Sequence, residues 1–158
     1  MRTSICAILI ALVALSNRES AHAQGPEFLQ AWRVGNADFD QGKGVAVDHE
    51  GNIFVIGDFT GPVVFEDITL SGKGGQNIFF TKYDASGRVL WARAAGGDLQ
   101  DFSAGIATDN NGNAVVAGTF RRVPPPAQNT SVAAEDLDIL LAQYNTTGER
   151  VWSKPLGF

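Results

Sequence analysis

The feature that most constrains the fold of this chain is an internal repeat, in which one long stretch of sequence recurs further along. Residues 44–59 align with residues 105–120, and the alignment continues downstream without a gap. About a quarter of the paired positions are identical, and these identities fall largely on glycines, aromatic residues and turn residues. A backbone geometry constrains such positions most strongly, so each copy is expected to form one supersecondary unit that stacks on its neighbour.

Each copy reads as two β-hairpins. In the first copy the pattern predicts strands over 44–48, 52–57, 77–83 and 88–94. The connecting segments combine Asp with Gly, which is the chemistry of tight turns. The residues at 53–56 are apolar on both sides of the pleat, which indicates a strand buried on both faces. The sequence therefore predicts an all-β fold with β-propeller blades of four antiparallel strands, about two blades, in an incomplete ring.

Three tryptophans mark the ends of the repeats. Trp91 and Trp152 are equivalent, and we expect both to be anchors buried between blades. Trp32 matches Trp91 as the end of a preceding unit. The domains expected after the leader at 1–23 are an N-terminal segment over 24–43, which holds the end of a preceding blade, and two blades over 44–97 and 98–158.

The leader at 1–23 reads as a secretory signal peptide. Arg2 precedes an apolar run over 5–15, which is followed by Ala21-His22-Ala23, a small-residue cleavage site. Cleavage after Ala23 would release the chain to a secreted, periplasmic or cell-surface location. Cys6 is the only cysteine, so the mature chain has no disulfide, thiol nucleophile or cysteine metal ligand.

The mature chain is acidic. Removing Arg2, Arg18 and Glu19 lowers the Lys and Arg count from 12 to 10 and the Asp and Glu count from 17 to 16, which leaves a net charge of −6. Such a surface argues against nucleic acid and anionic membranes as partners. The apolar run of the leader is too short to span a bilayer by the usual criterion of about 20 residues, so no membrane span is expected.

Residues 44–57 and 70–91, from Gly-Val-Ala-Val-Asp to Arg-Val-Leu-Trp, resemble the bacterial SBBP-type β-propeller repeats. The resemblance covers about residues 32–158 and is looser in the second copy. There, residues 121–136 depart from the Gly-rich insert of the family and are expected to form an extended loop. The resemblance implies an exported or surface-located propeller module, and it supplies no catalytic residues.

The candidate sites have simpler structural explanations. Asp109, Asn111 and Asn113 match the first ligands of a calcium loop, but Ala114 and Phe120 stand where such a loop needs Gly and Glu, so a hairpin turn is favoured. The lone mature histidine, His49, also lies in an expected turn. The glycine clusters at 72–75 and 96–97 lack the spacing of a phosphate loop.

Two recurring carboxylates precede the first strand of each copy. Asp40 and Asp101 could accept backbone hydrogen bonds at a blade junction or line the mouth of a channel, and the structural role is favoured. We therefore predict no catalytic, cofactor-binding or metal-binding residues and no cofactor.

The predicted function is a non-enzymatic module that serves as a binding or scaffold surface at the cell envelope or outside the cell. Its partner is an unknown macromolecule or a glycan. The alternative is an oligomeric carbohydrate-binding propeller lectin, and a less favoured third reading is a hydrolase with paired acidic residues in a channel. Two blades cannot close a ring, so we expect either a homo-oligomer or missing blades in a longer chain.

Overall fold

The computed structural model describes residues 34–35, 38–122 and 136–156. The chain divides into two units, 1–31 and 32–158, and all described residues belong to the second. The expected signal peptide, Trp32 and most of the expected extended loop lie outside the described residues.

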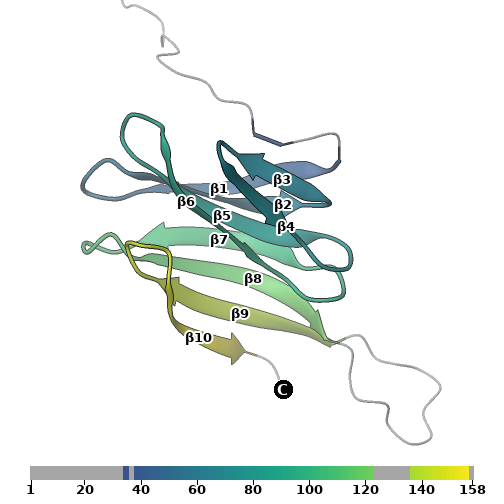
Figure 1. The fold of residues 1–158 in the computed structure, drawn as a ribbon. Coiled ribbons are helices and arrows are strands. Elements are labelled where there is room, and N and C mark those ends of the chain that lie inside the picture. Colours follow the sequence, from purple (N-terminus) through teal and green to yellow (C-terminus); the bar gives the residue numbers. More distant parts are fainter. Residues whose placement is uncertain (1–33, 36–37, 123–135, 157–158) are drawn as a thin grey trace, which may run out of the picture. The chain divides into compact units, whose positions relative to one another are not determined.

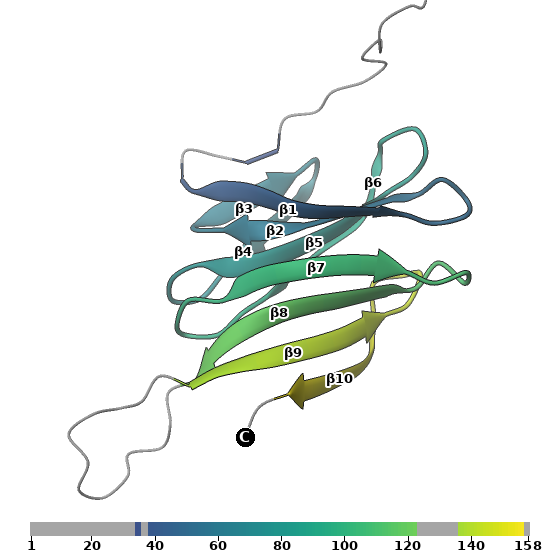
Figure 2. The ribbon, with the colours of Figure 1, turned by 180° about the vertical axis from the view of Figure 1, so that it is seen from behind.

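The described residues form two four-stranded antiparallel sheets and one small hairpin (Figures 1 and 2). Blade 1 contains β1 (Asp40–Val47), β2 (Ile53–Phe59), β5 (Asn77–Tyr83) and β6 (Val89–Ala95), in that order across the sheet. Blade 2 contains β7 (Phe102–Thr108), β8 (Ala114–Arg122), β9 (Asp136–Tyr144) and β10 (Arg150–Leu156), with the strand order β10-β9-β8-β7. The prediction of all-β, four-stranded antiparallel blades is confirmed, and the two blades do not close a ring.

The sequence repeat extends to the strand register. Ile53 pairs with Tyr83 in blade 1, and the equivalent pair in blade 2 is Ala114 with Tyr144. The register shifts recur as well: the shift between Gly42 and Gly44 is repeated between Ser103 and Gly105, and the shift at Lys82/Tyr83 is repeated opposite Arg150/Trp152. Because a bulge redirects every side chain beyond it, the two blades present equivalent faces.

Four hairpin turns of the described chain have the same construction. Each starts with an Asx side chain that accepts two backbone N–H groups and has a glycine with positive φ at its fourth position. The pairs are Asp48 with Gly51 (φ 82°), Asp84 with Gly87 (φ 86°), Asp109 with Gly112 (φ 73°) and Asn145 with Gly148 (φ 76°). The turns predicted from the Asx and Gly residues are confirmed.

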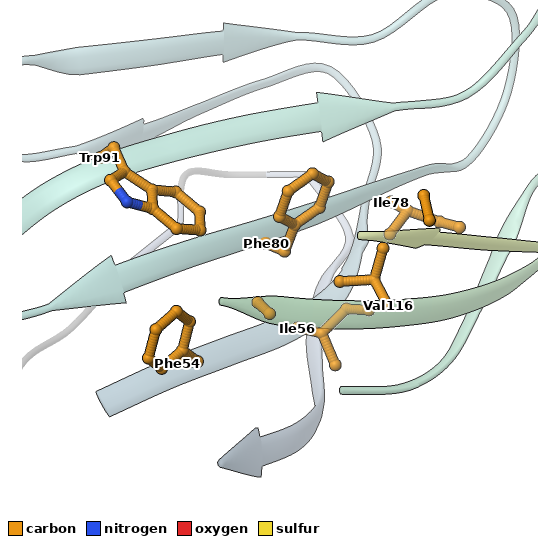
Figure 3. Packing of buried hydrophobic residues seen from close by; sticks show 8 residues of the cluster. Phe54, Ile56, Ile78, Phe80, Trp91 and Val116 are labelled. Atoms are coloured by element: carbon orange, nitrogen blue, oxygen red, sulfur yellow. The ribbon is translucent and has the colours of Figure 1, made fainter. Parts of the chain in front are cut away.

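The main core lies between the two blades. Blade 1 contributes Phe54, Ile56, Ile78, Phe80 and Trp91, and blade 2 contributes Ala114, Val116 and Ala142 (Figure 3). The Trp91 ring makes edge contacts with Phe54 and Phe80 at centroid distances of 5.9 and 6.1 Å. The prediction that Trp91 is buried between blades is confirmed.

One further hairpin, outside the two blades, was not predicted from the sequence. The strands β3 (Pro62–Phe65) and β4 (Ile68–Ser71) form a two-stranded sheet on the side of blade 1 away from blade 2 (Figure 1). Its inward side chains join a separate cluster with residues of blade 1; this cluster contains Phe59, Val63, Phe65, Leu70, Phe79 and Ala92. Blade 1 therefore has packed apolar side chains on both faces, as the doubly apolar strand indicated.

The predicted burial of Trp152 is wrong for this chain. Its side chain is 40% exposed, and its indole Nε1 donates a hydrogen bond to Gln143 on the adjacent strand at 2.6 Å. The physical reason is positional: Trp152 lies on the face of blade 2 that points away from blade 1. Among the described residues no third blade covers that face.

Candidate functional site

Each blade has two different faces. We call the face that carries Trp91 in blade 1 and Trp152 in blade 2 the anchor face. The opposite face, bordered by the turn glycine Gly87 or Gly148, is the socket face. Within the chain the anchor face of blade 1 packs on the socket face of blade 2.

The contact between the blades is centred on Trp91 and Gly148. The indole Nε1 donates a hydrogen bond to the carbonyl oxygen of Thr146 at 3.0 Å, far along the chain in blade 2. A Cβ added at Gly148 would lie 2.8 Å from Cδ2 of Trp91. Glycine is therefore needed here for two reasons, the left-handed backbone and the close approach of the ring.

Arg93 extends this contact along the same turn. Its Nε donates to the carbonyl of Gly148 at 2.9 Å, and its Nη2 donates to the carbonyl of Thr147 at 3.2 Å. The guanidinium lies 5.8 Å from the ring centroid of Trp91, within cation–π range. The turn carbonyls of blade 2 thus receive three side-chain hydrogen bonds from blade 1.

A buried ion pair lies beside this contact. Lys82 Nζ is 3.5 Å from Asp48 Oδ2 and 4.9 Å from the centroid of the Phe54 ring. Burial by itself raises the pKa of Asp48, but hydrogen bonds from Asn52 and the charge of Lys82 outweigh it and hold that pKa below its usual value. The carboxylate is therefore ionised and held as a structural partner of Lys82.

The socket face of blade 1 has no blade on it among the described residues, and it contains a pocket of about 350 Å³. The pocket lies between the sheet and the β3–β4 hairpin. Its lining is mainly apolar and consists of Val34, Asp40, Gln41, Gly42, Ile53, Val55, Val63, Phe65, Phe79, Tyr83 and Gly87.

The pocket has little charge. Burial raises the pKa of the Tyr83 phenol above its ordinary value, so this side chain stays neutral. Among the lining residues that the structure describes, Asp40 alone is acidic, and it is half-buried. A pocket of this kind suits an apolar or aromatic side chain better than a charged ligand.

The two recurring carboxylates have different surroundings. Asp101 is fully buried; its Oδ2 accepts the backbone N–H of Gly97 at 2.6 Å, and its Oδ1 accepts that of Arg121 at 3.3 Å. Burial raises the pKa of Asp101. Asp40, by contrast, borders the pocket. Of the two carboxylates, only Asp40 lines the pocket.

The calcium-like segment forms a hairpin turn. Asp109 Oδ1 accepts the backbone N–H groups of Asn111 and Asn113, both at 2.9 Å, and its Oδ2 accepts the side-chain amide of Asn113 at 2.8 Å. His49 is exposed in the equivalent turn of blade 1. No group of three or more potential metal ligands was found among the residues with described positions.

The pocket was not foreseen from the sequence, because one of its walls is the unpredicted β3–β4 hairpin. A signal for that hairpin is present. On either side of Glu66-Asp67, apolar residues alternate with polar or exposed ones, which is the pattern of two short half-buried strands; the apolar residues are Val63, Phe65, Ile68 and Leu70.

Comparison with known proteins supports the repeat architecture at a coarse level. No family model matches the chain. An uncharacterized WD repeat-containing protein of Acanthamoeba polyphaga mimivirus is 25% identical in a match that covers 91% of this chain and 13% of that protein. The chain thus spans about an eighth of that relative's length.

In the part of the chain that the structure describes, no helix has the length and hydrophobicity needed to cross a membrane.

Proposed function

We propose that this chain is an exported, non-enzymatic repeat module of the SBBP type, and that it binds another macromolecule through the pocket on the socket face of blade 1. The observation that carries the proposal is the apolar pocket of about 350 Å³ on a blade face that has no blade against it in the described chain. Exposed apolar surfaces of this kind mark interaction sites.

The side chains around the pocket support binding over catalysis. Burial raises the pKa of the Tyr83 phenol, which favours its neutral form, and the rest of the lining, apart from Asp40 and Gln41, is apolar or glycine. Catalysis by general acid and base needs titratable groups that face one another across a substrate. Of the acidic residues singled out in the sequence, the pocket lining contains Asp40 and does not contain Asp101.

Gly42 provides a direct test of binding. A Cβ added at Gly42 meets no atom within 4 Å, and the residue lines the pocket, so Gly42→Glu places a charge there with little strain. We expect cross-linking in the cell envelope fraction to capture a partner with the wild type and not with Gly42→Glu. The matched control is Gly97→Glu, which adds the same charge in a loop with equally open space. Equal capture by all three proteins would refute the pocket as the binding site.

Export is tested separately. The proposal requires that the chain recovered from outside the cytoplasm begins at Gln24, which N-terminal sequencing or intact mass would show. A chain that retains Arg2 would contradict it.

A carbohydrate-binding module is the second candidate, and one observation favours it: the indole of Trp152 is 40% exposed beside the Gln143 amide. An exposed aromatic ring next to a hydrogen-bonding amide suits a sugar ring. Glycan-array binding that disappears in Trp152→Ala would favour this candidate, and an array without signal would remove it.

A further inference from the structure

We propose that copies of this chain join head to tail: the anchor face of blade 2, with Trp152, docks onto the pocket of blade 1 in a second copy. This inference rests on the proposed function, because it names the partner of the same pocket. It starts from a contact that the chain already makes internally.

The internal contact is the template. Trp91 of blade 1 lies against Gly148 of blade 2 and hydrogen-bonds to the carbonyl of Thr146, while Arg93 binds the carbonyl of Gly148. Sequence, strand register and bulges all recur with the same spacing. The anchor face of blade 2 and the socket face of blade 1 can therefore each make the equivalent contact with a further blade.

The anchor half of the next contact is present and exposed. Trp152 stands at the position of Trp91, and Lys154 stands at that of Arg93. Ile139, at the position of the buried Ile78, is 49% exposed, and Trp152 is 40% exposed. Blade 2 therefore shows to solvent the residues that blade 1 buries against its neighbour.

The socket half is present on blade 1. Gly87 has a φ of 86°, close to the 76° of Gly148, and it borders the pocket together with Tyr83, the equivalent of Tyr144. By the template, the Trp152 indole of one copy would lie over Gly87 of the next. Its Nε1 would then donate its hydrogen bond to the carbonyl of Ala85 in that copy, the equivalent of Thr146, and no longer to the Gln143 side chain.

The two sockets differ at their other ends. The side chain closest to Gly118 of blade 2 is Ile78 of blade 1, whereas the side chain closest to Gly57 is Phe79 of the same blade. The β3–β4 hairpin also covers part of blade 1. The contact between copies would therefore concentrate on the Trp end, with one aromatic anchor in one pocket, which is the usual arrangement of an interface hot spot.

Such a contact is heterologous, because it joins two different surfaces. Repetition of a heterologous contact gives a closed ring or an open filament. Propellers close with about four to eight blades, so a ring of two-bladed chains would contain about two to four copies.

The experiment uses two complementary variants of the full chain. Trp152→Glu removes the anchor and keeps the pocket, whereas Ile53→Glu places a charge in the pocket beside Tyr83, at the Trp end, and keeps the anchor. We expect the wild type to self-associate in sedimentation velocity, and each variant alone to do so at least about tenfold more weakly, as expected for loss of a buried interface tryptophan. Mixing the two variants should restore association, but only to a dimer, since each supplies the surface that the other lacks.

Controls and a second variant keep the test decisive. Val151→Glu, on the same strand and 59% exposed, should assemble as the wild type does, and so should Gly97→Glu. Val55→Glu, two residues further along β2 and also in the pocket lining, replaces Ile53→Glu if that variant fails to fold. A mixture that stays monomeric would overturn the proposal.

The other occupants of the pocket give different results. A wild-type monomer that self-associates only after Trp32→Glu would assign the pocket to the chain's own N-terminal segment and would overturn the proposal. A monomer that still captures an envelope partner through the pocket would overturn head-to-tail joining and leave the proposed function intact. If the wild type neither self-associates nor captures an envelope partner, both the head-to-tail contact and the proposed function are refuted.

Discussion

At the scale of single residues, two equivalent tryptophans differ in solvent exposure because only one of them has a blade packed against it. Trp91 is 5% exposed and Trp152 is 40% exposed, although they occupy the same position in the repeat. The sequence could show that both residues belong to an anchor position. It could not show burial, because burial depends on the neighbouring blade and not on the residue.

Replacing Trp91 by Ala should lower the free energy of unfolding by about 3–5 kcal/mol, because it opens a cavity among Phe54, Phe80 and Gly148. Trp152→Ala should cost less than about 1 kcal/mol, as is usual for exposed positions. Urea denaturation of both variants measures the difference. A loss below about 1 kcal/mol for Trp91→Ala would remove this residue from the core.

The two turn glycines of blade 2 form a matched pair for a second measurement. Gly112→Ala should cost about 1–2 kcal/mol, since it forces an L-residue into the left-handed region while its Cβ meets ordinary contacts at 3.4 Å. Gly148→Ala should cost at least about 1 kcal/mol more, because its Cβ would also press on Trp91. Equal losses in urea denaturation would mean that Trp91 does not rest on this turn.

At the scale of elements, the four Asx-Gly turns could be predicted from sequence and the β3–β4 hairpin was missed. The turns have a local cause: Asp84, for example, accepts the backbone N–H groups of Ser86 and Arg88 within its own loop. The hairpin has a non-local cause, since Val63 and Phe65 are held by Phe79 and other blade residues. The pocket between hairpin and sheet follows from that packing, so the candidate site could not be assembled from local patterns.

The Asp84 turn predicts an acid dependence of stability. The Ser86 hydroxyl, followed by the backbone N–H of Arg88, lowers the pKa of Asp84 from 3.8 to about 2. Because the folded pKa is lowered, the stabilisation is complete above pH 3.8 and is lost as the pH falls toward 2.

Asp84→Asn should keep the turn, because Asn145 builds the same turn in blade 2. The stability difference between wild type and Asp84→Asn should therefore shrink as the pH is lowered from 3.8 to 2. Urea denaturation of both proteins across this window measures it. A difference that stays constant would contradict the lowered pKa.

At the scale of the whole molecule, neither blade completes the main core by itself. The main cluster takes Phe54, Phe80 and Trp91 from one blade and Ala114 and Val116 from the other. We therefore expect the fragments 1–97 and 98–158 to show no cooperative urea transition when separate, because a single sheet of this size leaves an apolar face in water.

Mixing the two fragments should restore a cooperative transition and the far-ultraviolet circular dichroism of the intact chain. A cooperative transition in either fragment alone would show that one blade is a folding unit by itself.

The repeated bulges and turn glycines also bear on how such chains change length. A repeat unit that carries both halves of its own contact can be duplicated or deleted as a whole without any new interface having to arise. Gain or loss of a fraction of the unit shifts the bulges and places Trp91 away from its glycine. Recombination within genes of this type should therefore be tolerated mainly in whole multiples of the repeat.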